Sequence, residues 1–140
     1  RPATAATSSA TITGTVSTGA GADTVIASNG VDSITTAGGF DVISLGVSGE
    51  AANDNVDGGA GFDSLSFNGG DQVTLTITDY STQAGTSTGQ GTDSFVGIES
   101  LTGNTAHTDT LQGLSSNEVV TLTGVDTGAI TLEDTTRSSY

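Results

Sequence analysis

The chain has 140 residues, and its 16 acidic residues against 2 basic ones give a formal net charge of −14. A length of this order corresponds to one domain. The charge argues against nucleic acid as a partner, because binding a phosphate backbone requires cationic side chains. It disfavours contact with an anionic membrane surface for the same reason.

Bound cations are expected to assist folding. Leu, Ile, Val and Phe make up 30 of the 140 residues, about 21%, which lies just above the composition at which strongly charged chains stay disordered. The sequence has no cysteine, so neither disulfides nor thiolate-bound metals can supply the missing stability. An aspartate-rich chain offers the oxygen ligands that a hard cation prefers, and Ca²⁺ is the first candidate.

The N-terminal segment precedes any acidic repeat. Residues 1–10, RPATAATSSA, are small and polar, a composition that predicts a tail. Residues 9–17, SATITGTVS, place Val16 in the frame of the repeats described next, with Gly14 where an aspartate would stand. We expect this segment to form a first turn that binds no cation and caps the repeats.

Five nine-residue frames follow, and in each an aspartate precedes an apolar residue by two positions. They begin at Thr18, Ala27 and Thr36 and, after a four-residue insertion, at Gly49 and Gly58. The aspartates in phase are Asp23, Asp32, Asp41, Asp54 and Asp63, and the apolar residues are Val25, Ile34, Ile43, Val56 and Leu65. Strands this short are expected to stack, with the apolar residues in one internal column and the aspartates along the outer turns.

The frame from Gly58, GGAGFDSLS, fits the consensus Gly-Gly-x-Gly-x-Asp-x-apolar-x at every fixed position, and through it the chain resembles the RTX family of secreted calcium-binding repeat proteins. The resemblance implies a parallel β-roll in which two successive frames make one coil and Ca²⁺ lies between neighbouring turns on the same edge. The implied pairs are Asp23 with Asp41, Asp32 with Asp54, and Asp41 with Asp63. The implied carbonyl ligands come from the glycine turns at Gly19, Gly21, Gly30, Gly39, Gly59 and Gly61.

Electrostatics gives a reason for an ion between such pairs. Two carboxylates one strand spacing apart, about 4.8 Å, would repel by about 3 to 4 kcal/mol at an effective dielectric constant of about 20. A bound cation reverses the sign of this interaction. The alternative is a β-helix without calcium, in which each aspartate only caps its turn by accepting hydrogen bonds from nearby backbone amides.

Beyond the repeats, residues 72–80, QVTLTITDY, alternate between apolar and polar side chains. The alternation puts Val73, Leu75 and Ile77 on one face and predicts a half-buried strand. Residues 81–92, rich in Gly, Ser, Thr and Gln, are expected to form a loop.

Two further segments complete the C-terminal part. Residues 93–113 are similar to the segments that follow or join repeat blocks in RTX proteins, and Asp109 and Leu111 there repeat the Asp-x-apolar signature. Residues 118–134 predict two strands around a Val-Asp-Thr-Gly turn.

The predicted fold class is all-β, because helical periodicity is absent throughout the chain. We expect a parallel β-roll or β-helix, an RTX-like solenoid, with less regular strands in the C-terminal part. The expected organisation is a tail at 1–10, a calcium-binding β-roll at 11–70 and a continuing β-rich region at 71–140, all within one continuous domain.

Catalytic motifs are missing from the sequence. It contains no cysteine nucleophile and no Gly-x-Ser-x-Gly turn, and the single histidine, His107, has no His-Glu-x-x-His context for zinc. The aspartates recur with a fixed period, as a structural ion ladder requires, whereas a catalytic carboxylate pair needs two unlike environments. We expect no enzymatic activity and a solvated His107.

Two classes of function remain. The first is an extracellular structural protein, such as a surface-layer, filament or matrix subunit, whose β-roll folds on Ca²⁺ and assembles with copies of itself. The second is the repeat module of a larger type I secreted toxin, protease or lipase. The acidic Thr/Ser/Gly-rich composition favours the first, as do the open ends of a roll, which another copy could cover. Either class predicts a secreted or cell-surface location without membrane insertion, and a glycan or cell-surface contact is left open as a further partner.

Overall fold

The structure is a computed structural model, and it describes residues 14–46, 51–69, 72–103, 109–113, 122–123 and 129–131. The regular structure within these residues consists of β-strands, without any α-helix. The predicted all-β class is therefore confirmed. Among the described residues, no helix is long and apolar enough to cross a membrane.

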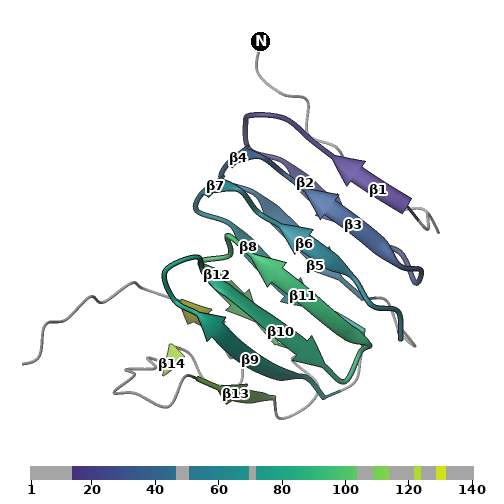
Figure 1. Cartoon of the computed structure of the whole chain (residues 1–140), viewed down its shortest axis with the longest axis vertical. Helices are drawn as coiled ribbons and strands as arrows, with labels where there is room; N and C mark the ends of the chain where they lie inside the picture. The colour runs from purple at the N-terminus through teal and green to yellow at the C-terminus, as the bar shows by residue number, and fades with distance from the viewer. Residues whose placement is uncertain are drawn as a thin grey trace, which may run out of the picture.

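Most strands belong to two sheets, whose strands are stacked like rungs along the long axis of the molecule (Figure 1). The first sheet has the spatial order β1 (Gly14–Ser17), β3 (Asp32–Thr35), β6 (Asn55–Asp57), β11 (Thr92–Val96), β10 (Ala84–Thr88), β9 (Thr74–Asp79) and β13 (Thr110–Gln112). The second sheet has the order β14 (Leu122–Thr123), β15 (Ala129–Thr131), β12 (Ser100–Thr102), β8 (Ser64–Phe67), β5 (Val42–Leu45) and β2 (Thr24–Ile26).

The nine-residue frames place their strands alternately in the two sheets. Strands β1, β3 and β6 pair in parallel in the first sheet, and β2, β5 and β8 pair in parallel in the second. Each frame therefore faces the frame two steps later, so that Val25 lies opposite Ile43 and Ile34 lies opposite Val56. The same parallel register holds on both sides of the four-residue insertion, in the pairs β3–β6 and β5–β8.

The apolar residues of the frames form the core between the sheets. Those predicted to be internal are 0–1% exposed, namely Val25, Ile34, Ile43, Val56 and Leu65. They form two facing columns and not one, because consecutive strands lie in different sheets. The same core continues into the C-terminal part through Phe67, Val73 and Leu101.

A third, two-stranded sheet joins the turns that lead from the first sheet to the second. It consists of β4 (Gly38–Gly39) and β7 (Ala60–Gly61), and Ala20 extends it by a parallel bridge to Gly38. We call this side, made of the stacked turns 18–22, 36–40 and 58–62, the glycine edge. Its turns hydrogen-bond directly to one another, since the Gly21 N–H donates to the Gly38 carbonyl and the Phe62 N–H to the Gly39 carbonyl.

Two sequence expectations for the middle of the chain had different outcomes. The strand at 72–80 is confirmed as β9, with its apolar face 0–2% exposed. The prediction of a loop at 81–92 is wrong, because β10 lies within this segment and pairs antiparallel with both β9 and β11. Strand β10 is made of small residues and packs closely against its neighbour, since a Cβ on Gly85 would lie 2.5 Å from Cζ of Phe95.

The described parts at the two ends agree with the expected register. In β1, Gly14 lies opposite Asp32 and Val16 opposite Ile34, as the frame of residues 9–17 predicts. The two strands predicted within 118–134 are β14 and β15, which pair antiparallel. The predicted tail at 1–10 and His107 lie outside the described residues.

The close stacking of the glycine edge makes a testable prediction. Gly39 has φ +150°, and a Cβ there would lie 1.8 Å from the Gly21 carbonyl oxygen. Gly39→Ala should therefore lower the free energy of unfolding by more than about 2 kcal/mol, measured by urea denaturation. Gly38→Ala is the matched control, because its Cβ would meet the Ala60 carbonyl oxygen at an ordinary 3.4 Å. Equal effects of the two substitutions would contradict the stacking.

Candidate metal site

The aspartates of the frames form two ladders, one under each edge of the molecule. In the first ladder, the carboxylates of Asp41 and Asp63 each accept a hydrogen bond from the backbone N–H of the aspartate two frames earlier. The Asp23 N–H donates to Asp41 Oδ1 at 2.8 Å, and the Asp41 N–H donates to Asp63 Oδ1 at 2.9 Å. Glu99 ends this ladder, since its Oε2 accepts from the Asp63 N–H at 2.7 Å. The first ladder lies where the glycine edge enters the second sheet.

The second ladder lies at the opposite edge and is built in the same way. The Asp32 N–H donates to Asp54 Oδ1 at 2.8 Å, and the Asp54 N–H donates to Asp93 Oδ1 at 3.0 Å. Gly14, which stands in the aspartate position of the first frame, donates its N–H to Asp32 Oδ1 at 3.3 Å. The three predicted aspartate pairs are therefore neighbours.

The ladders face the interior of the protein, and the expectation that the aspartates line the outer turns is wrong. Asp23 and Asp41 are 1% exposed and Asp63 is 0% exposed. The reason is the alternation of an extended chain, in which positions i and i+2 point to the same face. An aspartate two places before a core residue such as Val25 must enter the same interior.

The second carboxylate oxygens distinguish the two ladders. In the first ladder, no hydrogen bond reaches Oδ2 of Asp41, Oδ2 of Asp63 or either oxygen of Asp23, although all these atoms are buried. In the second ladder, Asp32 Oδ2 accepts from the backbone N–H and the hydroxyl of Ser28 at 3.0 and 2.9 Å. Asp93 Oδ2 accepts from the Ser87 hydroxyl at 2.6 Å. In the second ladder, Asp54 Oδ2 is also a buried oxygen that no hydrogen bond reaches. Both ladders therefore contain carboxylate oxygens that lack the polar partners that burial normally requires, and the first ladder contains more of them.

Burial raises the pKa of one carboxylate in each ladder. Burial raises the pKa of Asp63 to about 6, and repulsion from Asp41 and Glu99 adds to the effect, while the hydrogen bond from the Asp41 backbone opposes it. Burial also raises the pKa of Asp93, but the hydrogen bonds from Ser87 and from the Asp54 backbone act against the rise. Within the first ladder, Asp63 is the position at which a proton or a cation would relieve the cost of burying a charge.

The glycines expected to supply carbonyl ligands are divided between the two edges. Those of the glycine edge, close to the first ladder in the chain, are Gly19, Gly21, Gly39, Gly59 and Gly61. Gly30 lies at the opposite edge, where its N–H donates to the Ser28 hydroxyl at 3.2 Å. Among the described residues, no three acidic or histidine side chains converge as a metal-binding group. A cation at the first ladder would therefore need backbone carbonyl oxygens as well as carboxylates.

Sequence reasoning missed Asp93 and Glu99, which continue the two ladders. Both carry the acid-x-apolar signal, before Phe95 and Leu101. The signal is hidden because β9 and β10 are inserted ahead of them and interrupt the period of nine. Asp109 repeats the pattern once more, since its Oδ1 accepts from the Val73 N–H at 2.8 Å.

No model of a protein family, no curated protein and no solved structure matches this chain. The chemistry of the site is accordingly argued from its own geometry. Two stacked rows of buried aspartates, in which several carboxylate oxygens receive no hydrogen bond, can neutralise charge by taking up protons or hard cations.

The raised pKa of Asp63 predicts an unusual pH dependence when divalent ions are removed with EDTA. Its pKa is about 6 in the folded protein, against an ordinary value of 3.8, so the folded state binds more protons between these two pH values. Stability should then fall as the pH rises from about 4 to about 6. Asp63→Asn should flatten this decline, as measured by urea midpoints across that range.

Asp79→Asn is the control for the pH experiment. Asp79 is exposed, and hydrogen bonds from Ser81 lower its pKa. Its contribution to stability is therefore present above the pKa of the unfolded chain. That contribution is lost as the pH falls through the lower pKa of the folded protein. Asp79→Asn should leave the decline between pH 4 and 6 in place. An undiminished decline in Asp63→Asn would count against the burial of an uncompensated carboxylate.

Proposed function

We propose that this chain is an extracellular calcium-binding structural protein whose β-roll is stabilised by Ca²⁺ and assembles with further copies. The observation that carries the proposal is the first ladder, with buried carboxylate oxygens on Asp23, Asp41 and Asp63 that no hydrogen bond reaches. Such groups need a counter-charge, and the chain has only 2 basic residues to offer.

The arrangement of the strands supports the β-roll part of the proposal. Successive frames alternate between two parallel-paired sheets, and their turns stack in register at the glycine edge. This is the arrangement that the resemblance to RTX repeats implies. Two frames then make one coil, and aspartates two frames apart become neighbours.

The donor set of the first ladder suits calcium. Carboxylate and carbonyl oxygens are the ligands of a hard cation, and Ca²⁺ tolerates irregular coordination better than Mg²⁺ does. Asp23, Asp41 and Asp63 would hold the ion together with carbonyl groups of the glycine edge. Some of these carbonyls, such as that of Gly39, already accept a hydrogen bond, but a carbonyl oxygen has two lone pairs and can take a second partner. Calcium would supply the positive charge that compensates the ladder.

The second ladder is proposed to bind calcium more weakly than the first. Asp32 with Asp54 is one of the three pairs that the resemblance implies. However, Ser28 already donates two hydrogen bonds to Asp32 Oδ2, and Ser87 donates one to Asp93. A carboxylate with such donors has less to gain from an ion.

A structural role is proposed over a catalytic one because both ladders repeat one geometry without a distinct reacting group. Assembly follows from the shape of the sheets. In the first sheet, β1 pairs on one side only among the described strands, and an open sheet edge is a ready template for another chain. The repeat module of a larger secreted protein remains the competing function, and the first experiment below separates the two.

Calcium addition to the metal-free chain should increase its β-sheet circular dichroism and raise its melting temperature, because ion binding to the folded state adds to stability. For an assembling subunit, sedimentation velocity in the same samples should also show larger species with calcium than with EDTA. A calcium-dependent gain in structure with a strictly monomeric sedimentation profile would favour the secreted-module function. No response to calcium in either measurement would refute both.

The assignment of the ion to the first ladder is tested by paired substitutions. Asp41→Asn and Asp63→Asn should each lower the calcium affinity by at least about tenfold, because ligand charge sets calcium affinity, as measured by titration calorimetry. Asp32→Asn should have a smaller effect. Asp79→Asn removes an exposed carboxylate outside both ladders and should leave the affinity unchanged. A larger loss from Asp32→Asn than from Asp63→Asn would contradict the order of the two ladders.

A further inference from the structure

The first ladder has an open position at its first member. Asp41 and Asp63 each accept a backbone N–H at Oδ1, while no hydrogen bond reaches their Oδ2. In Asp23, which is 1% exposed, no hydrogen bond reaches either oxygen. Asp23 therefore lacks the one bond that the other two aspartates receive from the strand before them.

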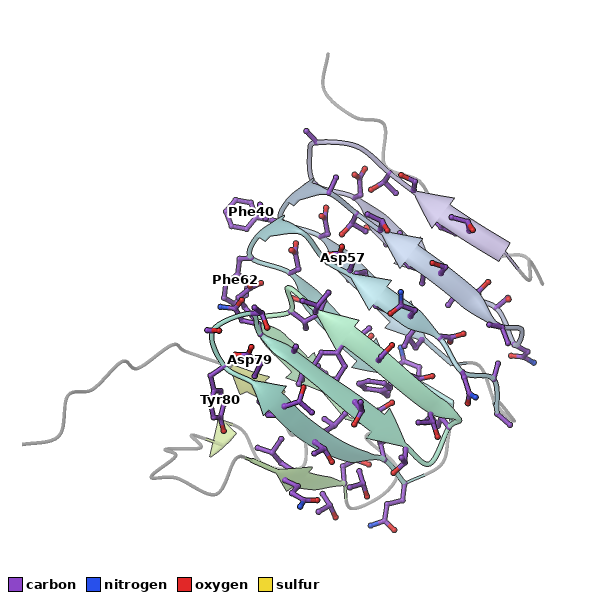
Figure 2. All side chains as sticks on the ribbon, in the orientation of Figure 1. Phe40, Asp57, Phe62, Asp79 and Tyr80 are labelled. Atoms are coloured by element: carbon purple, nitrogen blue, oxygen red, sulfur yellow. The ribbon has the colours of Figure 1, made fainter. Side chains whose placement is uncertain are left out.

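The missing donor would lie beyond the described edge of the second sheet. Strand β2, which follows Asp23, pairs with β5 on one side, and no described strand pairs with it on the other. Figure 1 shows β1 and β2 at the same end of the molecule. In Figure 2 the labelled rings of Phe40 and Phe62, each immediately before an aspartate of the first ladder, mark the side on which Asp23 lies. An open strand edge beside a buried carboxylate is a place for one more strand.

The second ladder shows what fills such a position. Its first aspartate, Asp32, accepts at Oδ1 from the N–H of Gly14, which stands 18 residues earlier and lies opposite Asp32 in the parallel pair of β1 and β3. The residue 18 places before Asp23 is Ala5. The position requires only a backbone N–H, so an alanine can supply it as the glycine does.

The length of chain before β1 fits the same step. Residues 27–31 lead from the end of β2 to the start of β3. Residues 9–13, a segment of equal length, lead from Ser8 to the start of β1 at Gly14. Residues 5–8 therefore stand where a strand that pairs with β2 would connect to β1.

We infer that residues 5–8 form an end strand that pairs in parallel with β2 of the same chain and donates the Ala5 N–H to Asp23 Oδ1. Composition alone predicts a tail for residues 1–10, and the open edge of β2 gives the central part of this tail a partner. The end strand extends the second sheet by one strand and supplies the hydrogen bond that Asp23 lacks.

Charge and connection favour the chain's own segment over a second copy. Residues 1–22 contain no acidic side chain, and Arg1 is one of the two basic residues. A segment without carboxylates approaches the buried charge of Asp23 at less cost than the acidic parts of another copy do. The short connection 9–13 also holds the segment near β2 at a high effective concentration.

The end strand is independent of the proposed calcium binding. Asp23 would keep Oδ2 for an ion, as Asp41 and Asp63 do, because the strand uses Oδ1 only. The strand also closes the β2 edge of the second sheet to other copies and leaves the β1 edge of the first sheet for the proposed assembly.

Amide hydrogen exchange of the full chain in calcium, measured by NMR, tests the end strand. Slow exchange of the β5 amides shows in the same sample that the roll is folded. The Ala5 N–H should exchange at least about tenfold more slowly than the Ala6 N–H after correction for sequence effects. Ala6 is equivalent to Val42, whose N–H donates to the Asp23 carbonyl of the strand before it, so the Ala6 N–H would point away from β2.

Two proline variants separate the Ala5 N–H from the general effect of a proline. Ala5→Pro removes the required donor and should speed exchange of the Ser9 N–H by at least about tenfold. Ser9 is equivalent to Ala27, whose N–H donates to the Ser44 carbonyl. Ala6→Pro is the matched control, because an edge strand tolerates proline where its N–H faces solvent, and it should leave Ser9 protected.

Two alanine variants test the acceptor. Asp23→Ala should speed exchange at Ala5 and leave Gly14 unchanged. Asp32→Ala should speed exchange at Gly14, whose N–H it accepts, and leave Ala5 unchanged.

The outcomes are distinct from those for the proposed function. Fast exchange at Ala5 while the β5 amides stay protected would overturn the end strand, as would equal effects of the two proline variants. Protection of Ala5 that appears only in larger species by sedimentation velocity would assign the β2 edge to another copy and overturn it as well. A protected Ala5 in a chain that does not respond to calcium would support the end strand and refute the proposed function.

Discussion

The spacing of the acidic and apolar residues is the constraint from which the rest of this structure follows. Because positions i and i+2 of an extended strand share a face, each strand that buries a core residue such as Ile43 also buries the aspartate two places before it. Burying a carboxylate is costly unless it is hydrogen-bonded or paired with a positive charge. Every coil therefore brings a charge into the interior together with its apolar residue, and the protein has to compensate that charge.

The first part of the compensation is common to both ladders. Apart from Asp23, each carboxylate accepts a hydrogen bond from the backbone of the preceding member of its ladder, as Asp63 does from Asp41. This bond holds the coils in register at the point where each strand begins. It also uses a backbone N–H at the start of the strand, a group that would otherwise need another partner.

The second part of the compensation divides the molecule into two unlike edges. At one edge, Ser28 and Ser87 supply further donors to Asp32 and Asp93 of the second ladder. At the glycine edge the turns consist of Gly, Ala, Thr and Phe and supply no such donor. Close stacking of these turns leaves their side chains either absent or pointing outward, as Phe40 does. The same feature thus leaves buried carboxylate oxygens without hydrogen bonds on the interior side and exposed rings on the exterior side.

The sequence alone determined the all-β class, the short strands, and which aspartates and apolar residues face one another, because these depend on a local period of nine that is visible in the chain. The alternation of side chains along an extended strand also implies that the aspartates point inward, although their place next to the turns suggested that they point outward. Only the tertiary structure decided that Asp93 and Glu99 extend the ladders and that 84–88 form a strand. The two ladder contacts join residues 39 and 36 positions apart. The strand at 84–88 depends on its antiparallel pairing with both β9 and β11. Packing likewise decided that serine hydroxyls donate to Asp32 and Asp93 and that none donates to Asp41 or Asp63. The sequence does not indicate which carboxylate a serine will contact, because the two residues meet only in the folded chain.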